Sequence, residues 1–217
     1  MNNPSTYLSE TIKELKKHWP ENRTINIVCH GHSVPSGYFA TPYVDTFNAY
    51  PHLFHKALKE RFPYAVINVI VTGIGGENSE SGDKRLEETV LNHKPDIITI
   101  DYGLNDRGIG LETSKKAWSS MIEKCLESDS KVLLMTPTLD QTMNPSNNTN
   151  NDPELTQHAE QIIKLANQYN IGLVDSFNAN LNYIKDNHIS DILSASNHPN
   201  ALGHQLVTKE LMRWFTP

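Results

Sequence analysis

The sequence predicts an α/β protein built on a doubly wound, mostly parallel sheet. Short β-branched apolar runs alternate with longer segments of helical periodicity, which is the pattern of stacked βαβ units. The apolar runs are nearly continuous, as in strands that are covered on both faces. Because crossover connections are right-handed, helices should cover both sides of the sheet. The 217 residues fit a single domain spanning residues 1–217.

Each element follows from a local pattern. Five strands are expected, at Ile25–Cys29, Ala65–Val71, Asp96–Ile100, Lys131–Thr136 and Ile171–Val174. A leading helix is expected within residues 1–20, from apolar residues at helical spacing, Leu8, Ile12, Leu15 and Trp19. Pro51 suits the first turn of the next helix. Four more helices are expected at Ser81–His93, Leu111–Ser128, Pro153–Tyr169 and Asn200–Phe215.

Composition and charge exclude several classes of protein. A net charge of −6 argues against binding to nucleic acid, which needs clustered Lys and Arg. No apolar run is long enough to span a membrane, and no basic-then-apolar leader opens the chain. We therefore expect a cytoplasmic protein, or a secreted one if a leader has been removed. Cys29 and Cys125 lack a metal-type spacing and are expected to be core residues.

Ser33 follows the first expected strand and should therefore lie where such sheets bind their ligands. In doubly wound sheets the ligand crevice lies outside the carboxyl ends of the strands. The first strand ends in Cys29-His30-Gly31-His32-Ser33-Val34, so a glycine turn places a serine there. By itself a Gly-x-Ser at a strand end is also common as a plain turn.

The next two strands end in candidate donors for a developing negative charge. The second strand leads into Gly73-Ile74-Gly75-Gly76, where backbone N–H groups before a helix suit an anion. The third ends in Asp101-Tyr102-Gly103-Leu104-Asn105-Asp106. There the Asn105 carboxamide can donate to the same oxyanion, or the Asn-Asp pair can simply cap a helix.

His198 immediately precedes the last expected helix, in the run Asn197-His198-Pro199-Asn200. Asn200 is a good helix cap, and Pro199 restricts the loop. The imidazole is thereby held near the start of a helix and can serve as a base. The plain alternative is a surface histidine.

Together these residues resemble the four sequence blocks of SGNH (GDSL-like) hydrolases. The matching segments are Gly31-x-Ser33, Gly76 in Gly-Gly-x-x-Ser, Gly103-x-Asn105-Asp106 and His198-Pro199-Asn200. Their order and approximate spacing agree with the family over nearly the whole chain. The resemblance implies a flavodoxin-like three-layer α/β/α sandwich with a mostly parallel five-stranded sheet. It also implies hydrolysis of esters or thioesters through an acyl-enzyme, and we expect neither a cofactor nor a metal.

The family's functional roles then fall on four residues. Ser33 is the expected nucleophile and His198 its base, because a serine hydroxyl attacks poorly until a base within reach takes its proton. The expected oxyanion donors are the Ser33 N–H, the Gly76 N–H and the Asn105 side chain. Each such donor is typically worth about 10² to 10³ in rate.

The sequence departs from the family pattern at two positions. The family usually has Asp before its serine, where this chain has His32. It also has Asp three residues before the histidine, where this chain has Ala195. Asp191 is the nearest carboxylate and is the expected triad acid if the segment curls back. Otherwise a backbone carbonyl or water orients the imidazole of a Ser–His dyad.

Three other interpretations stay open. Gly73-Ile74-Gly75-Gly76 is part of a dinucleotide fingerprint, although Asn78 stands where its last glycine belongs. A metal hydrolase would use the histidines His30, His32, His52 and His55, but no carboxylate or cysteine completes a recognised spacing. These histidines more simply line a polar wall or cap the first strand. In the third interpretation, the missing acid marks a binding module without catalysis.

The substrate is the least determined property. The segment Tyr38–Thr46, with Tyr43, Asp45 and Thr46, and the Asn-rich segment Asn144–Asp152 indicate a polar cleft with a mobile rim. We therefore expect a small-molecule or carbohydrate ester, most simply a sugar that carries acetyl or another short acyl group. Thioesters and lysophospholipids remain alternatives.

Overall fold

The structure is a computed structural model that describes residues 3–145 and 153–216. Most of the Asn-rich segment for which a mobile rim is expected therefore lies outside the described residues. Within the described ranges the helices are α1 Pro4–Tyr7, α2 Ser9–Lys16, α3 Tyr50–Arg61, α4 Ser79–Thr89, α5 Gly110–Glu127, α6 Pro153–Gln168, α7 Ser176–Ile184 and α8 Ala201–Met212. The strands are β1 Thr24–Gly31, β2 Val66–Val71, β3 Ile97–Asp101, β4 Lys131–Met135 and β5 Gly172–Val174.

The described strands form one parallel sheet in the order β2-β1-β3-β4-β5. This is the flavodoxin-like order, in which the direction of winding reverses between β1 and β3. The register of these two strands pairs Gly31 with Asp101. The segments that carry Ser33 and Asn105 therefore leave adjacent strands at the point where such sheets form their ligand crevice.

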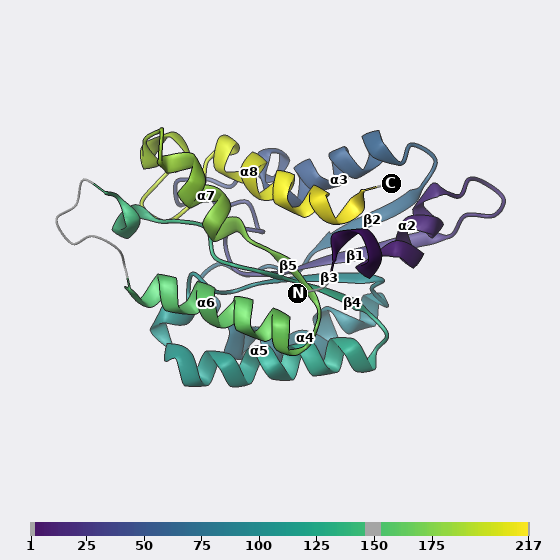
Figure 1. The fold of residues 1–217 in the computed structure, drawn as a ribbon, viewed down its shortest axis with the longest axis horizontal. Helices are drawn as coiled ribbons and strands as arrows, with labels where there is room; N and C mark the ends of the chain where they lie inside the picture. The colour runs from purple at the N-terminus through teal and green to yellow at the C-terminus, as the bar shows by residue number, and fades with distance from the viewer. Residues whose placement is uncertain (1–2, 146–152, 217) are drawn as a thin grey trace.

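Helices cover both faces of the sheet, which lies between two layers in Figure 1. The α3, α7 and α8 helices form one layer, and α4, α5 and α6 form the other. Neighbouring strand residues contribute to opposite cores: Ile97 belongs to the cluster under α3 and α8, and Ile98 to the cluster under α4 to α6. Burial on both faces explains the nearly continuous apolar runs. The predicted three-layer fold is confirmed.

The leading helix differs from the prediction. It is divided at Leu8 into α1 and α2, and α2 ends at Lys16. Leu8, Ile12 and Leu15 are buried, as their spacing predicts, but Trp19 lies beyond the helix and is 82% exposed. The expectation that Trp19 belongs to the apolar stripe was therefore wrong. Helix α7 is not among the helices that the sequence predicts.

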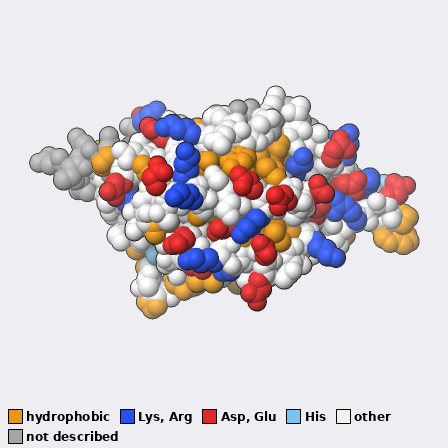
Figure 2. All heavy atoms as spheres, turned by 90° about the horizontal axis from the view of Figure 1, so that it is seen from below, with side chains coloured by type: hydrophobic (Ala, Val, Ile, Leu, Met, Phe, Trp, Pro, Cys, Tyr) orange, Lys and Arg blue, Asp and Glu red, His pale blue; other side chains and the backbone are white. Residues whose placement is uncertain are grey.

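The face formed by α4, α5 and α6 carries mixed charge. Figure 2 shows acidic and basic side chains interspersed over this face. Ion pairs on it join Lys84 to Glu80 and Lys124 to Asp83. Among the described residues, no helix is both long and apolar enough to cross a membrane.

Candidate active site

The structure brings Ser33 and His198 together from opposite ends of the chain. The Nε2 atom of His198 lies 2.9 Å from the Oγ atom of Ser33. Both side chains are 7% exposed, so the contact is partly shielded from water. This is the distance and the pair of atoms expected of a nucleophile and its general base.

Ser33 is held in a tight turn that follows β1. The Tyr38 N–H donates to the Ser33 carbonyl at 3.1 Å, and the Gly37 N–H donates to the Val34 carbonyl at 3.0 Å. Gly37 has φ +85°, a left-handed conformation that favours glycine. The turn also places the Tyr38 ring beside His198, with stacked ring centroids 6.1 Å apart.

His198 is positioned by a loop that is fixed at several points. Its carbonyl accepts hydrogen bonds from the Ser194 N–H at 3.0 Å and from the Ser194 hydroxyl at 3.2 Å. Asn200 accepts from the Leu202 and Gly203 N–H groups and caps α8, as the sequence predicts. The loop therefore enters α8 in a defined direction.

The electrostatics of the site keep His198 neutral. Burial lowers the pKa of the imidazole from its usual 6.5, and the charge of His32 lowers it further. The nearby backbone of Phe39 opposes both effects and raises the pKa. A neutral ring at physiological pH can take the proton of Ser33.

Asp191 does not take part in this contact. Its carboxylate accepts a hydrogen bond from the His188 N–H at 3.1 Å and caps a short helix, Ile189–Asp191. The residue is exposed, and among the described residues no hydrogen bond or ion pair joins it to His198. The expected triad acid is therefore not brought to the imidazole, because this helix directs the side chain to its own backbone. The Phe39 backbone contact matches the alternative of a dyad oriented by a carbonyl.

The expected oxyanion donors lie in adjoining loops. Within the described residues, the N–H groups of Ser33 and Gly76 donate no hydrogen bond to the protein. Gly76 has φ +81°, and a Cβ there would meet no atom within 4 Å, so the side of the residue where a Cβ would lie is open. Asn105 donates from Nδ2 to the carbonyl of Glu77 at 2.8 Å. That bond fixes the carboxamide beside the Gly76 loop and leaves its second N–H to donate.

A network of buried and partly buried side chains supports the Gly76 loop. Arg85 pairs with Glu77, with Nη2 2.5 Å from Oε2, and also donates to the hydroxyl of Tyr102 at 3.1 Å. The Tyr102 hydroxyl in turn lies 3.1 Å from Nε2 of His30. On the other side of the His30 ring, Nδ1 lies 2.9 Å from the hydroxyl of Thr72. Burial, followed by the charge of Arg85, lowers the pKa of His30 to about 3. His30 is thus a neutral structural link.

Asp106 joins the Asn105 loop to two helices. Its carboxylate accepts from the Ser79 N–H at 2.8 Å, at the start of α4, and from the Trp118 indole at 2.6 Å. Burial raises the pKa of Asp106, although both of these hydrogen bonds oppose the rise. Asp106 therefore has the capping role that the sequence left open, whereas Asn105 is held beside the Gly76 loop by its bond to the Glu77 carbonyl.

The four histidines considered for a metal site do not gather at one place. His52 and His55 line a small cavity of about 110 Å³ between α3 and β2. His32 is buried beside Ser33. No group of three or more His, Cys, Asp or Glu side chains in the described part of the chain is arranged to hold a metal ion.

The glycines proposed for a dinucleotide fingerprint include one with a packing role. A Cβ at Gly73 would come within 2.5 Å of the Ser36 hydroxyl and 2.7 Å of the His32 carbonyl. The Gly73 loop thus lies directly against the Ser33 turn.

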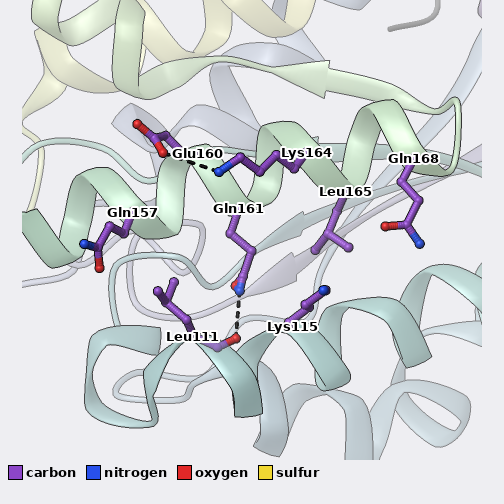
Figure 3. A pocket seen from close by; sticks show the side chains of 8 residues that line it. All are labelled: Leu111, Lys115, Gln157, Glu160, Gln161, Lys164, Leu165 and Gln168. Carbon is purple, nitrogen blue, oxygen red and sulfur yellow. Dashed lines mark hydrogen bonds and ion pairs between the residues drawn. The ribbon is translucent and has the colours of Figure 1, made fainter.

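A larger cavity lies away from Ser33. It has a volume of about 250 Å³ and lies between α5 and α6. Figure 3 shows that its wall is formed by polar and charged side chains, including Lys115, Gln161 and Lys164. Gln161 bridges the two helices by donating to the Leu111 carbonyl at 2.7 Å. None of the predicted site residues lines this cavity.

Comparison with known proteins agrees with this geometry. The model of the GDSL-like Lipase/Acylhydrolase family matches residues 29–206. The chain belongs to that family. It is accordingly a carboxylic ester hydrolase. No curated protein sequence matches the chain significantly.

Solved structures share the fold of this family member. Axe2, an acetylxylan esterase from Geobacillus stearothermophilus, aligns with a TM-score of 0.77 and 20% identity, covering 89% of this chain and 94% of that one. LAE5, an α/β hydrolase enzyme from the metagenome of Lake Arreo in Spain, aligns with a TM-score of 0.76 and 18% identity, covering 88% and 94%. At these identities the likeness establishes the fold.

Proposed function

We propose that this GDSL-like hydrolase removes short acyl groups, above all acetyl, from a carbohydrate or similarly polar alcohol through an acyl-enzyme. Ser33 is the nucleophile and His198 the general base. The observation that carries this assignment is the 2.9 Å contact between Ser33 Oγ and His198 Nε2. The lowered pKa of His198 supports it, because the base must be neutral to accept a proton.

The reaction follows from the contacts. His198 takes the Ser33 proton while Oγ bonds to the ester carbon, and the carbonyl oxygen becomes an oxyanion. The N–H groups of Ser33 and Gly76 and the Asn105 carboxamide stabilise that charge. His198 then returns the proton to the leaving alcohol. Water repeats the sequence on the acyl-enzyme and releases the acid.

The preference for a short acyl group is supported by Tyr38. Its ring is stacked with His198 and lies against the Gly75 backbone, where a Cβ would come within 3.3 Å of the ring. Tyr38 thus lies between the base and the oxyanion loop and narrows the space above Ser33. A long acyl chain would have to displace it.

Exposed aromatic side chains on the segment after Tyr38 support the preference for a polar, carbohydrate-like alcohol. Tyr43 is 60% exposed and Phe47 is 73% exposed, both on the segment that follows Tyr38. Exposed aromatic faces give the C–H faces of a sugar a surface to pack on. Axe2, which shares the fold, is an acetylxylan esterase, which favours the same chemistry.

A panel of esters tests the proposal. We expect p-nitrophenyl acetate to be hydrolysed faster than the butyrate and palmitate, acetylated sugars to lose acetate, and Ser33→Ala to abolish all of these activities. In Tyr38→Ala the ratio of kcat/KM for butyrate over acetate should rise about tenfold, since each methylene is worth roughly 1–3 kcal/mol in a fitted pocket. A preference of the wild type for palmitate or for thioesters would contradict the assigned substrate.

Labelling of Ser33 distinguishes an enzyme from a binding module on the same fold. A fluorophosphonate should modify the wild-type chain at Ser33, because its hydroxyl is activated by His198. His198→Ala should be modified more slowly. A folded wild-type chain that stays unmodified would indicate a binding module.

A further inference from the structure

Ser33 is in contact with a second imidazole. The Nδ1 atom of His32 lies 3.3 Å from Ser33 Oγ, in addition to the contact that His198 makes. The Val34 N–H donates to the same Nδ1 atom, also at 3.3 Å. An N–H directed at Nδ1 requires a lone pair there, so in its neutral form the His32 ring carries its proton on Nε2.

The opposite edge of the His32 ring faces a buried carboxylate. Nε2 lies 3.5 Å from Oδ1 of Asp101, and the two side chains are 1% and 6% exposed. The backbone supports the same pairing, because the His32 N–H donates to the Asp101 carbonyl at 3.3 Å. This juxtaposition follows from the register of β1 and β3, which places Gly31 opposite Asp101.

The charge of Asp101 also acts on Tyr50. Burial, and after it the charge of Asp101, raise the pKa of the Tyr50 hydroxyl well above its usual value. Among the described residues, Nε2 of His32 makes no hydrogen bond of good geometry, and Asp101 is its ion-pair partner. A positive charge that formed on His32 would therefore be met by this carboxylate.

Carboxylate, imidazole and hydroxyl thus follow one another in the order of a catalytic triad, but through His32 rather than His198. We propose that His32, oriented by Asp101, is a second general base for Ser33. The inference rests on the proposed role of Ser33 as nucleophile. It also gives a function to the histidine that replaces the family's usual Asp.

The burial of His32 limits which steps it can serve. His32 Nδ1 takes the Ser33 proton as Oγ bonds to the ester carbon and the carbonyl electron pair moves to oxygen. When the C–O bond breaks, an activated phenolate leaves with the electron pair and needs no proton. A sugar alkoxide does need one, and a ring that is 1% exposed does not reach it. His198 therefore remains necessary for sugar esters and for attack by water.

Because His32 and His198 serve different steps, His198→Ala should still carry out the first step with an activated ester. The variant should react once with p-nitrophenyl acetate, release one p-nitrophenolate per chain and stop as an acetyl-enzyme. Intact-mass spectrometry and peptide mapping should find the acetyl group on Ser33. The same variant should be inactive on acetylated sugars.

The test compares the acetylation rate of His198→Ala with that of His198→Ala/His32→Asn. The Asn oxygen can still accept from the Val34 N–H, but it supplies no base and does not reach Asp101. We expect the rate to fall at least tenfold, because a positioned base typically contributes about 10² to 10⁴. Asp101→Asn in the same background should also slow acetylation. His93→Asn is the control, since His93 is exposed and precedes β3, at the end of that strand opposite to Asp101, and it should leave the rate unchanged.

The outcomes separate this inference from the proposed function. If the wild type does not hydrolyse p-nitrophenyl acetate, the proposed function fails. If the wild type is active and His32→Asn leaves acetylation of His198→Ala unchanged, or His198→Ala is not acetylated at all, His32 is only structural and the inference is overturned. Melting temperatures of all variants identify any that unfold, and for those the Asp101→Asn rate decides.

Discussion

The two sides of Ser33 are built in different ways. On the proposed oxyanion side, Asn105 and the Gly76 loop are fixed by side chains, through the Glu77–Arg85 ion pair and the Tyr102 hydroxyl. On the proposed base side, the loop that carries His198 is fixed by its own backbone, and the ring has no described carboxylate partner. The chain can thus lose the usual triad acid and keep the base in place, because loop geometry supplies the orientation.

This contrast predicts that the oxyanion side is the more sensitive to single substitutions beyond Ser33 and His198. Asn105→Ala removes a donor to the developing charge and also the bond to the Glu77 carbonyl. We expect kcat for p-nitrophenyl acetate to fall about 10² to 10³-fold, with a smaller change in KM. Asn92→Ala is the control, since Asn92 bonds only to its own helix region. A loss below about threefold would remove Asn105 from the oxyanion hole.

The ion pair beneath the loop should have the next largest effect. Arg85→Met leaves Glu77 unpaired with a side chain that is only 15% exposed. We expect a loss of about 2 kcal/mol in the free energy of unfolding, between the values for exposed and buried pairs, and a roughly tenfold lower kcat because the Gly76 loop loosens. Urea titration and ester kinetics measure the two effects.

The matched control for Arg85→Met is Lys84→Met on the same helix. Lys84 pairs with Glu80, but these side chains are 70% and 49% exposed, so the free energy of unfolding should change by less than about 0.5 kcal/mol. Equal effects of the two substitutions would show that the buried network does not support the loop.

Much of this architecture could be predicted from the sequence. The five strand positions were predicted to within two residues, because each run is apolar and β-branched and ends at a polar loop, although the edge strand β2 is partly exposed. The Asn200 cap was predictable from its place before α8. The short helix α7 was missed because its sequence, SFNANLNYI, is rich in Asn, a weak helix former. Packing of Phe177 and Leu181 into the core outweighs that propensity.

The parts of the site that the sequence did not reveal depend on tertiary contacts. Tyr38 reaches His198 only because the turn after Ser33 folds back. The pairing of His32 with Asp101 needs the register of β1 and β3, which sequence patterns do not specify. One signal was present: His32 and Asp101 both lie just after predicted parallel strands, and such strands bring these positions to the same edge of the sheet.

The pH dependence of kcat/KM should show whether the charge of His32 acts on His198. Burial and the charge of His32 lower the pKa of His198, so the acid limb of kcat/KM should lie below the usual 6.5 of histidine. Activity is lost as the pH falls through that pKa, because the protonated ring cannot accept a proton. His32→Asn removes one of the lowering charges, so the acid limb should move to higher pH.

Two further contacts bear on the same titration. His204, on α8, is close enough to His198 for the charge of His198 to lower its pKa. The Tyr38 ring is stacked on the His198 ring. Both are retained in His32→Asn, so the comparison with wild type isolates His32. An unchanged acid limb, or one that moves to lower pH, would show that the charge of His32 does not reach His198.

Asp191→Asn should have the smallest effect. The Asp191 carboxylate is exposed and caps the short helix Ile189–Asp191 by accepting from the His188 N–H, and Asn can still accept that bond. We expect kcat/KM to change by less than about twofold, whereas removal of the acid from known triads costs about 10⁴-fold. Steady-state kinetics over the full pH range is the measurement. A loss of 10²-fold or more would mean that the segment rearranges during catalysis and brings Asp191 to His198, which would make the base side depend on a carboxylate after all.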